Sequence, residues 1–349
     1  MSSDVFNSCN LPINDQACIS LGHGSGGKLS SNLINEFFLP YLGNEILNEL
    51  EDASVVTLNQ DNIAVSIDSF VVNPIFFPGG NIGSLSVHGT INDLAVRGAK
   101  PLFIAASFIM EEGFLLEDLT KIIQAMQLAC RQNNVKLITA DTKVVNKGDC
   151  DKIFITTSGI GLVTANDIPS VSKAKVNNNI LVSGDIGRHG MAIMATREEF
   201  ELESTIESDS ASLYSLINLI LASDIQVNCL RDITRGGLAT VLNEIAMASG
   251  IGIVIDESQI PIQTNVAALG EILGIDPLYI ACEGRFVAVV DEIRAQDLLA
   301  IMHSHPLGTN AAIIGKVVDD PDNNVIAKTI IGGSRLVDTL LFDELPRIC

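Results

Sequence analysis

The sequence predicts two mixed α/β domains (α/β or α+β) followed by a short tail. Its 349 residues exceed what one hydrophobic core usually organises. Strand-like and helix-like segments follow one another in both halves of the chain. Between the halves, residues 163–179 are polar and break the apolar rhythm. We therefore expect an N-terminal domain over 1–163, a C-terminal domain over 164–335 and a flexible tail over 336–349.

The spacing of apolar side chains identifies the elements of the first half. Ile63, Val65 and Ile67 alternate with small or polar residues, as in a half-buried strand. Apolar residues at helical spacing mark 115–132 as a helix instead. In chain order, we expect a helical stretch over 31–42, a strand over 62–72, helices over 84–99 and 115–132, and strands over 135–145 and 151–163.

The second half repeats the mixed pattern. We expect a strand over 179–187, helices over about 211–222 and 237–249, and strands over 250–256, 284–290 and 311–318. The acidic stretch 198–210 is most simply a solvated loop.

The composition excludes several classes of partner. The chain has 21 Lys and Arg against 42 Asp and Glu, a net charge of −21, which disfavours nucleic acid and anionic membranes. The absence of Trp, with only three Tyr, removes an aromatic platform for bases. No apolar run reaches about 18 residues, so neither a membrane span nor a signal peptide is expected. The seven cysteines form no C-x-x-C pair and indicate free thiols in a reducing compartment, by default the cytoplasm.

Two glycine-rich stretches are suited to hold a phosphate group. "GHGSGGK" (22–28) can turn backbone N–H groups inward and adds the charge of Lys28, although a plain flexible turn explains it equally well. "TRGGL" places Gly236 and Gly237 at a helix N-terminus beside Thr234 and Arg235. The alternative for this second stretch is a loop-to-helix junction that needs small residues. The sequence pattern of a P-loop is absent.

Aspartates recur where apolar segments stop, at Asp61, Asp68, Asp93, Asp141 and Asp232. Grouped in space, such carboxylates would bind Mg²⁺ and connect it to phosphates. Each one alone is more simply a helix cap or a turn residue. Asn92 and Asp93 are harder to explain in that way, because they lie inside an expected helix, where neither has good propensity.

Two further residues have the chemistry for proton transfer. Lys143 follows Asp141 by two positions at a strand end, so both side chains point to the same side, where they are either functional or a surface ion pair. Glu283 precedes Gly284 at a strand entrance and is a candidate base, with an exposed turn residue as the simpler interpretation. Its neighbour Cys282 is expected in the core.

The printed sequence ends in "PRIC". Cys349 lies on a polar, proline-containing tail, so it is not expected in a buried core. Arg347 favours the thiolate, whereas the terminal carboxylate opposes it. The residues alone leave Cys349 as either a functional thiol or a chance final residue.

Eight strings carry a resemblance to a known family. They are "LGHGSGGK", "IDSFVVNPIFFPGGNIGSLSVHGTINDLAVRGAKP", "EEGF", "DTKVV", "SGDIGRHGMAI", "RDITRGGL", "EGR" and "PRIC". In this order, from about residue 20 to 349, they resemble the HypE family of nickel–iron hydrogenase maturation factors. That family lies in the PurM-like (aminoimidazole ribonucleotide synthetase) superfamily. Ala140 departs from the pattern, which has a glycine before Asp141.

The resemblance implies a two-domain PurM-like fold whose N-terminal sheet pairs across a homodimer, with ATP bound near that interface. It implies Mg²⁺ ligands at Asp61, Asp68, Asp93 and Asp232. With the glycine-rich stretches, the expected nucleotide-binding residues are Lys28, Asp68, Thr90, Asn92, Asp93, Asp141, Thr234, Arg235, Gly236 and Gly237. The resemblance also implies Cys349, Lys143 and Glu283 as catalytic residues, the latter two in proton transfer.

The implied activity is ATP-dependent dehydration of a carbamoyl group carried on Cys349. A HypF-type carbamoyltransferase would load the group, ATP would convert it to an iminophosphate, and loss of phosphate would leave a thiocyanate. The cyanide would then pass to iron on a HypC–HypD scaffold complex. Two other functions remain open: a small-molecule ATP-dependent synthetase of the selenophosphate or thiamine-phosphate type, and a non-enzymatic scaffold that offers its tail thiol to a partner.

Overall fold

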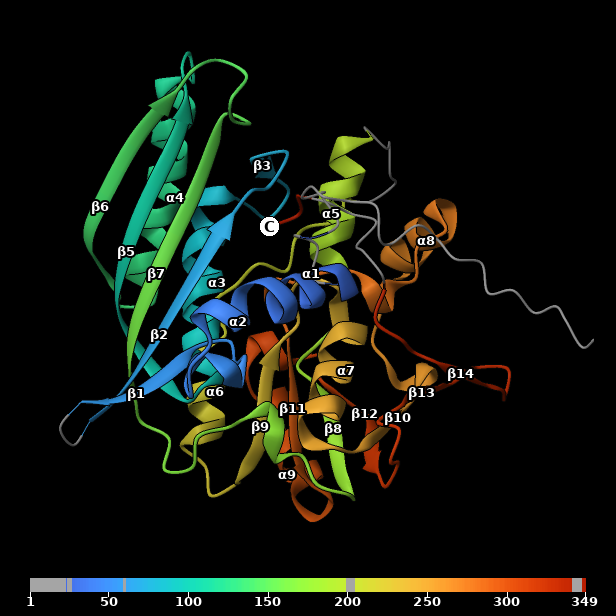
Figure 1. The fold of residues 1–349 in the computed structure, drawn as a ribbon. Coiled ribbons are helices and arrows are strands. Elements are labelled where there is room, and N and C mark those ends of the chain that lie inside the picture. Colours follow the sequence, from blue (N-terminus) through green and yellow to red (C-terminus); the bar gives the residue numbers. More distant parts are fainter. Residues whose placement is uncertain (1–22, 24–26, 59–60, 199–204, 341–346) are drawn as a thin grey trace, which may run out of the picture.

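The computed structural model describes His23 and residues 27–58, 61–198, 205–340 and 347–349. Their strands form two main sheets with helices between and around them (Figure 1). The first sheet has the strand order β1-β2-β7-β5-β6, and the second has the order β14-β13-β10-β12-β8-β11-β9. This mixed architecture confirms the predicted α/β class.

The first sheet is built from the N-terminal half. Its strands are β1 (Ser54–Leu58), β2 (Asp61–Phe70), β5 (Ala99–Glu111), β6 (Lys136–Val145) and β7 (Ile153–Val163). Strands β5 and β6 are parallel, and the other three neighbouring pairs are antiparallel. The helices α3 (Ile82–Val96) and α4 (Leu116–Gln132) cover one face, as Figure 1 shows, and a short hairpin of β3 (Phe76–Phe77) and β4 (Gly80–Asn81) precedes α3.

Helix α3 begins two residues before its predicted start because Asn81 caps it. The Asn81 side chain accepts the backbone N–H groups of Gly83 and Ser84 at 2.8 and 3.3 Å, and Ser84 Oγ accepts the Asn81 N–H at 3.1 Å. Gly98, with φ +71°, follows the end of the helix. Nearly every residue of α3 is buried, because the helix lies against the first sheet on one side and the second half on another.

Strand β5 is an element that the sequence did not reveal. Pro101 and a run of small residues obscure the alternation that normally marks a strand. In the structure, the register with β7 shifts between Pro101 and Phe103, so the chain accommodates the proline at an irregularity.

The C-terminal half forms the second sheet. Its strands are β8 (Asn178–Val182), β9 (Val227–Asp232), β10 (Gly252–Asp256), β11 (Phe286–Asp291), β12 (Ala312–Val318), β13 (Val325–Lys328) and β14 (Ser334–Leu336). Its helices are α5 (Arg188–Arg197), α6 (Tyr214–Leu221), α7 (Gly237–Ser249), α8 (Thr264–Leu273) and α9 (Ala295–His303). Helix α7 has the predicted bounds. The N-terminal helical stretch comprises α1 (Lys28–Leu33), a π-helical turn and α2 (Leu39–Leu42).

The two halves share a hydrophobic core. Ala95 and Val96 of α3 lie in one cluster with Phe286 and other residues of the second half. Arg97 then donates a hydrogen bond to the carbonyl of Pro169 in the connecting segment.

The C-terminal segment differs from the predicted tail over 336–349. Val337 is fully buried and donates its N–H to Val325 O at 2.8 Å, so the second sheet extends to this residue. Residues 341–346 of the predicted tail lie outside the described part of the chain. Beyond them Ile348 is only 3% exposed, and Cys349 is half-buried against the same core, contrary to the expectation for the terminal cysteine. The chain end is buried because it pairs with the segment that follows β2, as the position of the C-terminus in Figure 1 indicates.

The outer face of the first sheet is apolar. Val65, Ile160 and Phe103 lie in register across β2, β7 and β5, and each is exposed. Ile67 on the same face of β2 is 70% exposed. Strand β6 at the sheet edge is exposed along nearly its whole length. This face therefore resembles a surface that another protein covers.

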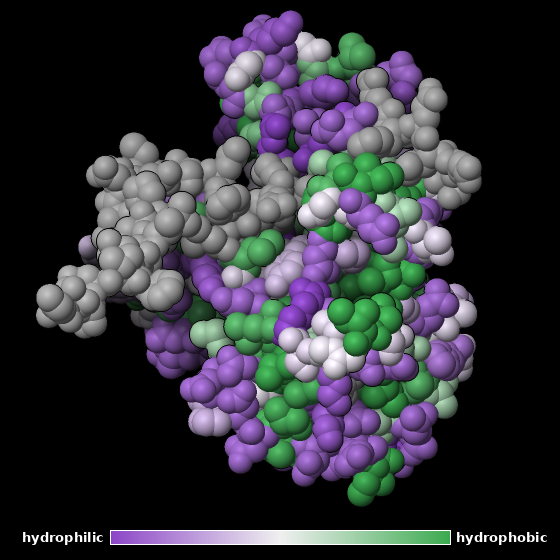
Figure 2. Space-filling view, turned by 90° about the vertical axis from the view of Figure 1, so that its right-hand side faces the viewer, coloured by the Kyte–Doolittle hydropathy of each residue, from purple (hydrophilic) through white to green (hydrophobic). Residues whose placement is uncertain are grey.

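Figure 2 shows the side of the molecule that lies on the right of Figure 1. Hydrophobic residues there form separate groups between hydrophilic ones. Among the described helices, none combines the length and the apolar character that crossing a membrane requires.

Candidate active site

A cavity of about 380 Å³ lies where the two halves meet. Its walls come from α1, the end of β2, α3, the β9–α7 turn, the residue before Gly284, and Cys349. Residues far apart in the sequence thus face one volume that is large enough for a small ligand.

Three carboxylates meet in this cavity. Asp52 precedes β1, Asp93 comes from α3 and Asp232 ends β9, and one oxygen from each lies within 4.8 Å of the others. Asp68 of β2 lines the same cavity, and Ser66 Oγ donates a hydrogen bond to Asp93. The structure therefore brings together three predicted residues, Asp68, Asp93 and Asp232, and adds Asp52, which the sequence reasoning missed.

Burial and crowding make these carboxyl groups difficult to ionise. Burial is the main cause that raises the pKa of Asp93, and the charges of Asp68, Asp232 and Asp52 raise it further. Burial likewise raises the pKa of Asp232 to about 7, although the charge of Arg231 opposes the shift. Asp52, Asp68, Asp93 and Asp232 outnumber the two guanidinium groups that line the cavity, Arg231 and Arg235, so a bound cation would relieve the repulsion that remains.

The donor atoms fit a hard divalent cation. Asp52 Oδ2 and Asp232 Oδ2 are buried without a hydrogen-bond partner among the described residues. Carboxylate oxygens are the ligands that Mg²⁺ prefers, and a double positive charge would both satisfy these oxygens and relieve the repulsion. Asp52, Asp93 and Asp232 would hold such an ion.

The cluster predicts that Mg²⁺ stabilises the fold in a pH-dependent way. The folded-state pKa of Asp232 lies above its ordinary value, so the stability this group contributes is full at low pH and is lost as pH rises through about 7. Mg²⁺ should restore it, raising the thermal unfolding temperature by several degrees at about pH 8 and by less than half as much at about pH 6. Differential scanning fluorimetry with and without Mg²⁺ measures both values.

Two buried histidines also make the stability of the fold depend on pH, so a control is needed to assign the Mg²⁺ effect to the carboxylate cluster. Burial lowers the pKa of His88 to about 4 and lowers that of His189, so both titrate with the opposite effect on stability, but neither belongs to the carboxylate cluster. Asp232→Asn should remove most of the Mg²⁺ increment, and Asp319→Asn on the surface should leave it unchanged. An increment of equal size at both pH values would contradict the assignment.

Glu283 is buried beside the carboxylates. Its N–H donates to Asp209 Oδ1 at 3.1 Å, and its carbonyl accepts from Asn92 Nδ2 at 3.3 Å, so its main chain is fixed from both halves. Its Oε1 has no hydrogen-bond partner within the described chain. Burial, and then the charge of Asp232, raise the pKa of Glu283 well above its usual range. A carboxyl group with these properties is suited to proton transfer.

The β9–α7 turn supplies a positive side chain and a helix N-terminus. Gly236 and Gly237 have φ of +77° and +64°, and a side chain at Gly237 would strike the Leu278 carbonyl. These two glycines shape the backbone, whereas Thr234 and Arg235 line the cavity. The charge of Cys349 is the largest of the effects that raise the pKa of Arg235, and both residues line the cavity.

Thr90 and Asn92 were predicted to contact the nucleotide. In the structure they lie on faces of α3 that do not line the cavity. Thr90 Oγ1 is within 2.6 Å of Thr157 Oγ1 in the core. Asn92 accepts the N–H of Leu213 at 2.8 Å and donates to the carbonyls of Ala211 and Glu283. Asn92 therefore positions Glu283 and joins the two halves, because its polar groups are already used by protein partners.

Three other predicted residues lie away from the cavity in this chain. Asp61 is exposed at the opposite end of β2, seven residues or about 23 Å along the strand from Asp68. Asp141 and Lys143 are 68% and 71% exposed on β6 and lie 3.5 Å from one another, in the surface ion pair that the sequence allowed. A single chain does not bring these three side chains to the carboxylate cluster.

Lys28 forms an exposed ion pair with Asp338 at 2.6 Å, and its N–H donates to Leu340 O at 2.9 Å. It joins α1 to the C-terminal segment and does not line the cavity, although His23 does. Most of the remaining glycine-rich loop lies outside the described residues.

The sequence reasoning missed the basic side of the cluster. Arg231 binds Asp52 and Glu244, each at 2.9 Å, and lines the cavity with both. Arg231 stands in the string "RDITRGGL", which was singled out in the sequence, whereas Asp52 lies two residues before β1 and carried no such signal.

Comparisons with known proteins identify the family. The family model of AIR synthase related protein, N-terminal domain, matches residues 50–163, and that of the C-terminal domain matches 175–328. Carbamoyl dehydratase HypE of Cupriavidus necator is 48% identical over 332 residues, which are 95% of each chain. The chain belongs to the HypE family. It is therefore an enzyme of the carbamoyl dehydratase class. The predicted family and the predicted enzyme class are both confirmed.

Other HypE proteins agree in sequence and in structure. Carbamoyl dehydratase HypE of Escherichia coli is 41% identical over 95% of this chain and 99% of its own. The HypE–HypF complex contains a chain with 47% identity and a TM-score of 0.83, covering 88% of this chain and 99% of that one. HypE in complex with ATP has 41% identity and a TM-score of 0.80, covering 94% and 99%. AaThiL complexed with AMPPCP and TMP, at 15% identity and a TM-score of 0.68, shares the fold.

Proposed function

We propose that this enzyme serves hydrogenase maturation by dehydrating a carbamoyl group, carried on the Cys349 thiol, to a thiocyanate at the expense of ATP. The observation that carries the proposal is the position of Cys349, which lines the same cavity as the carboxylate cluster and Glu283. A related HypE has been solved with ATP and another with HypF, which supports ATP as the co-substrate and a HypF-type carbamoyltransferase as the partner that loads the thiol. A HypC–HypD scaffold complex would receive the cyanide.

The balance of the reaction defines what the residues must do. The carbamoyl oxygen attacks the γ-phosphorus, ADP leaves and one N–H proton is lost, which gives an S-bound iminophosphate. The second N–H proton and phosphate then leave together, and S–C≡N remains. Two protons must therefore be removed from nitrogen, and negative charge must be stabilised on oxygen.

Named side chains are available for each task. Bound Mg²⁺ would supply the positive charge that lets an anionic nucleotide enter a cavity rich in carboxylates. Arg235, which lines the cavity together with Cys349, stabilises charge that develops on the carbamoyl oxygen. Glu283 accepts a proton from nitrogen. Neutralising Asp232 and Asp68 would remove part of what raises the pKa of Glu283, and so leave it able to accept that proton.

Intact mass spectrometry tests the proposal. The chain is incubated with a HypF-type carbamoyltransferase, carbamoyl phosphate and ATP, and its intact mass is followed over time. We expect a carbamoyl adduct first and then the loss of one water from that adduct, both mapped to Cys349. A chain ending at Ile348 that takes up and dehydrates the group equally well would overturn the proposal.

A homodimer would explain the exposed apolar sheet face and the position of Lys143. We propose that a second copy covers the face formed by Val65, Ile160 and Phe103, where neighbouring apolar side chains on three strands are exposed. The exposed edge strand β6, with Asp141 and Lys143, would then lie at or near the contact. Lys143 could act in the site of the opposite subunit rather than its own.

Mixed dimers test whether Lys143 acts across the subunits. Lys143→Ala and Cys349→Ser chains with different tags are co-expressed, and the dimers that carry both tags are purified. If Lys143 serves the opposite subunit, each mixed dimer keeps one intact site and should show about half of the wild-type dehydration rate. If Lys143 serves its own chain, the mixed dimer should be inactive. Full activity of the Lys143→Ala homodimer would remove Lys143 from the reaction.

A further inference from the structure

The last three residues are held by main-chain hydrogen bonds to the segment that follows β2. Val71 N–H donates to Cys349 O at 3.1 Å, and Asn73 N–H donates to Arg347 O at 3.1 Å. Partners that approach in opposite chain directions at every second residue have the pattern of antiparallel pairing. The segment that continues β2 thus grips the chain end through its main chain, in the manner by which sheet edges bind extended peptides.

His189 binds the carbonyl of Ile348, the terminal carbonyl that Val71 and Asn73 do not bind. His189 Nε2 lies 2.9 Å from Ile348 O, and a carbonyl can only accept, so Nε2 carries the hydrogen. His189 Nδ1 then accepts from Ser208 Oγ at 2.7 Å, and Ser208 Oγ accepts the N–H of Ser210 at 3.0 Å. His189 is fully buried, and its ring contacts Phe77 edge-on at 5.3 Å between centroids. Its tautomer and orientation are therefore fixed.

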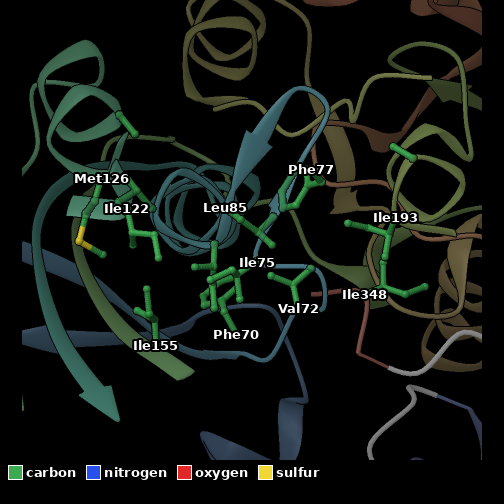
Figure 3. Packing of buried hydrophobic residues seen from close by; sticks show 14 of the residues in the cluster. Phe70, Val72, Ile75, Phe77, Leu85, Ile122, Met126, Ile155, Ile193 and Ile348 are labelled. Atoms are coloured by element: carbon green, nitrogen blue, oxygen red, sulfur yellow. The ribbon is translucent and has the colours of Figure 1, made fainter. Parts of the chain in front are cut away.

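Ile348 supplies the side-chain contact. It lies in the first core cluster, and Figure 3 places it next to Ile193 of α5. A Cβ built at Gly190 would lie 3.6 Å from Ile348 Cδ1, an ordinary contact distance, and 2.5 Å from Ile280, so Gly190 lets α5 pack closely on Ile280 beside the anchor. Arg197 adds a hydrogen bond to Arg347 O.

We propose that Val71, Asn73, His189 and Arg197 form a tail dock that binds the main-chain carbonyls of residues 347–349, with Ile348 as its anchor and His189 as a positioning residue. All three terminal carbonyls are bound, so the dock fixes the Cys349 backbone where its side chain meets the cavity. The inference rests on the proposed function for its purpose, since a carrier thiol must be brought to the dehydration site. It assigns to His189 a role that the sequence reasoning did not.

Alkylation of Cys349 measures docking without ATP, carbamoyl phosphate or a partner. Full-length chains are treated with iodoacetamide, the modification of Cys349 is followed by peptide mass spectrometry, and each rate is divided by the rate in denaturant. Ile348→Ala and His189→Asn should react at least about fivefold faster than wild type, because undocking exposes the thiol. His189→Gln should remain within about twofold, because Gln Nε2 can replace His Nε2 as the donor whereas Asn is too short. Ile331→Ala, at a residue that is 95% exposed, is the matched control for the tail substitution.

The two substitution sites make the test independent of folding. Thermal unfolding of each full-length variant shows whether a change at the buried His189 has damaged the core. If it has, the Ile348→Ala result decides, provided that the unfolding temperature of this variant stays at the wild-type value. Equal rates for Ile348→Ala and wild type, or for folded Asn and Gln variants at 189, would overturn the dock. If Cys349 is protected from iodoacetamide but takes up no carbamoyl group in the mass-spectrometry assay, the dock stands and the proposed function is refuted.

Discussion

Cys349→Ser is expected to abolish carbamoyl uptake and therefore every later step. A serine hydroxyl stays protonated at neutral pH and is a much weaker nucleophile than a thiolate. The other described cysteines offer no substitute, because burial raises the pKa of Cys130, Cys150, Cys229 and Cys282. Intact mass after incubation with a HypF-type carbamoyltransferase, carbamoyl phosphate and ATP should match that of the untreated chain.

Cys150→Ser is the matched control for this substitution. Cys150 lies between β6 and β7, outside the residues that line the cavity, so the variant should load and dehydrate the carbamoyl group like the wild type. An adduct on the Cys349→Ser chain at the wild-type level would show that another thiol is the carrier. Peptide mapping would then locate it, with Cys9 and Cys18, which lie outside the described residues, included in the search.

Glu283→Gln is expected to slow dehydration by about 10²–10⁴-fold while leaving carbamoyl uptake unchanged. Glutamine preserves the size of the side chain and the two main-chain hydrogen bonds to Asp209 and Asn92, but it cannot accept a proton. The carbamoyl form should therefore accumulate. A time course of the carbamoyl and cyano masses at saturating ATP measures the two steps separately.

The control for Glu283→Gln is the same change at Glu271, an exposed residue of α8. Glu271→Gln should dehydrate the group at the wild-type rate. If Glu283→Gln does so as well, another group removes the proton, and Lys143→Ala in the same assay is the next variant to measure. Slower carbamoyl uptake by Glu283→Gln would indicate a general loss of structure rather than the loss of a base.

Local patterns in the sequence were enough to predict the elements that hold the main cavity residues. Alternation identified β2, helical spacing identified α4, and the glycine pair located the start of α7. Asp68, Asp93 and Asp232 stand at points where an apolar pattern stops, and the fold brings all three to one cavity. Such positions can be recognised from the local sequence, because burying a carboxylate next to an apolar segment costs free energy unless the group is paired or binds a cation.

Other features depend on contacts between distant segments and left little local trace. Helix α3 is buried on nearly all sides, so its sequence could not show that Asp93 faces the cavity while Thr90 and Asn92 do not. His189 looks like an ordinary helix residue until Ile348, 159 positions later, accepts its hydrogen bond. The burial of the chain end was missed for the same reason, because residues 71–73 are needed to form its pairing partner.

The core shared by α3 and the second half has a consequence for how the protein can change. Phe286 and its neighbours pack on Ala95 and Val96, and Asn92 ties α3 to the segment that carries Glu283. The boundary near residue 163 thus separates two halves of the sequence, but the two halves do not unfold independently. Heating should melt the molecule in one cooperative step. Replacing one half with that of a distant relative would disrupt the packing of this core. Substitutions at the contact between the halves must therefore be matched on both sides.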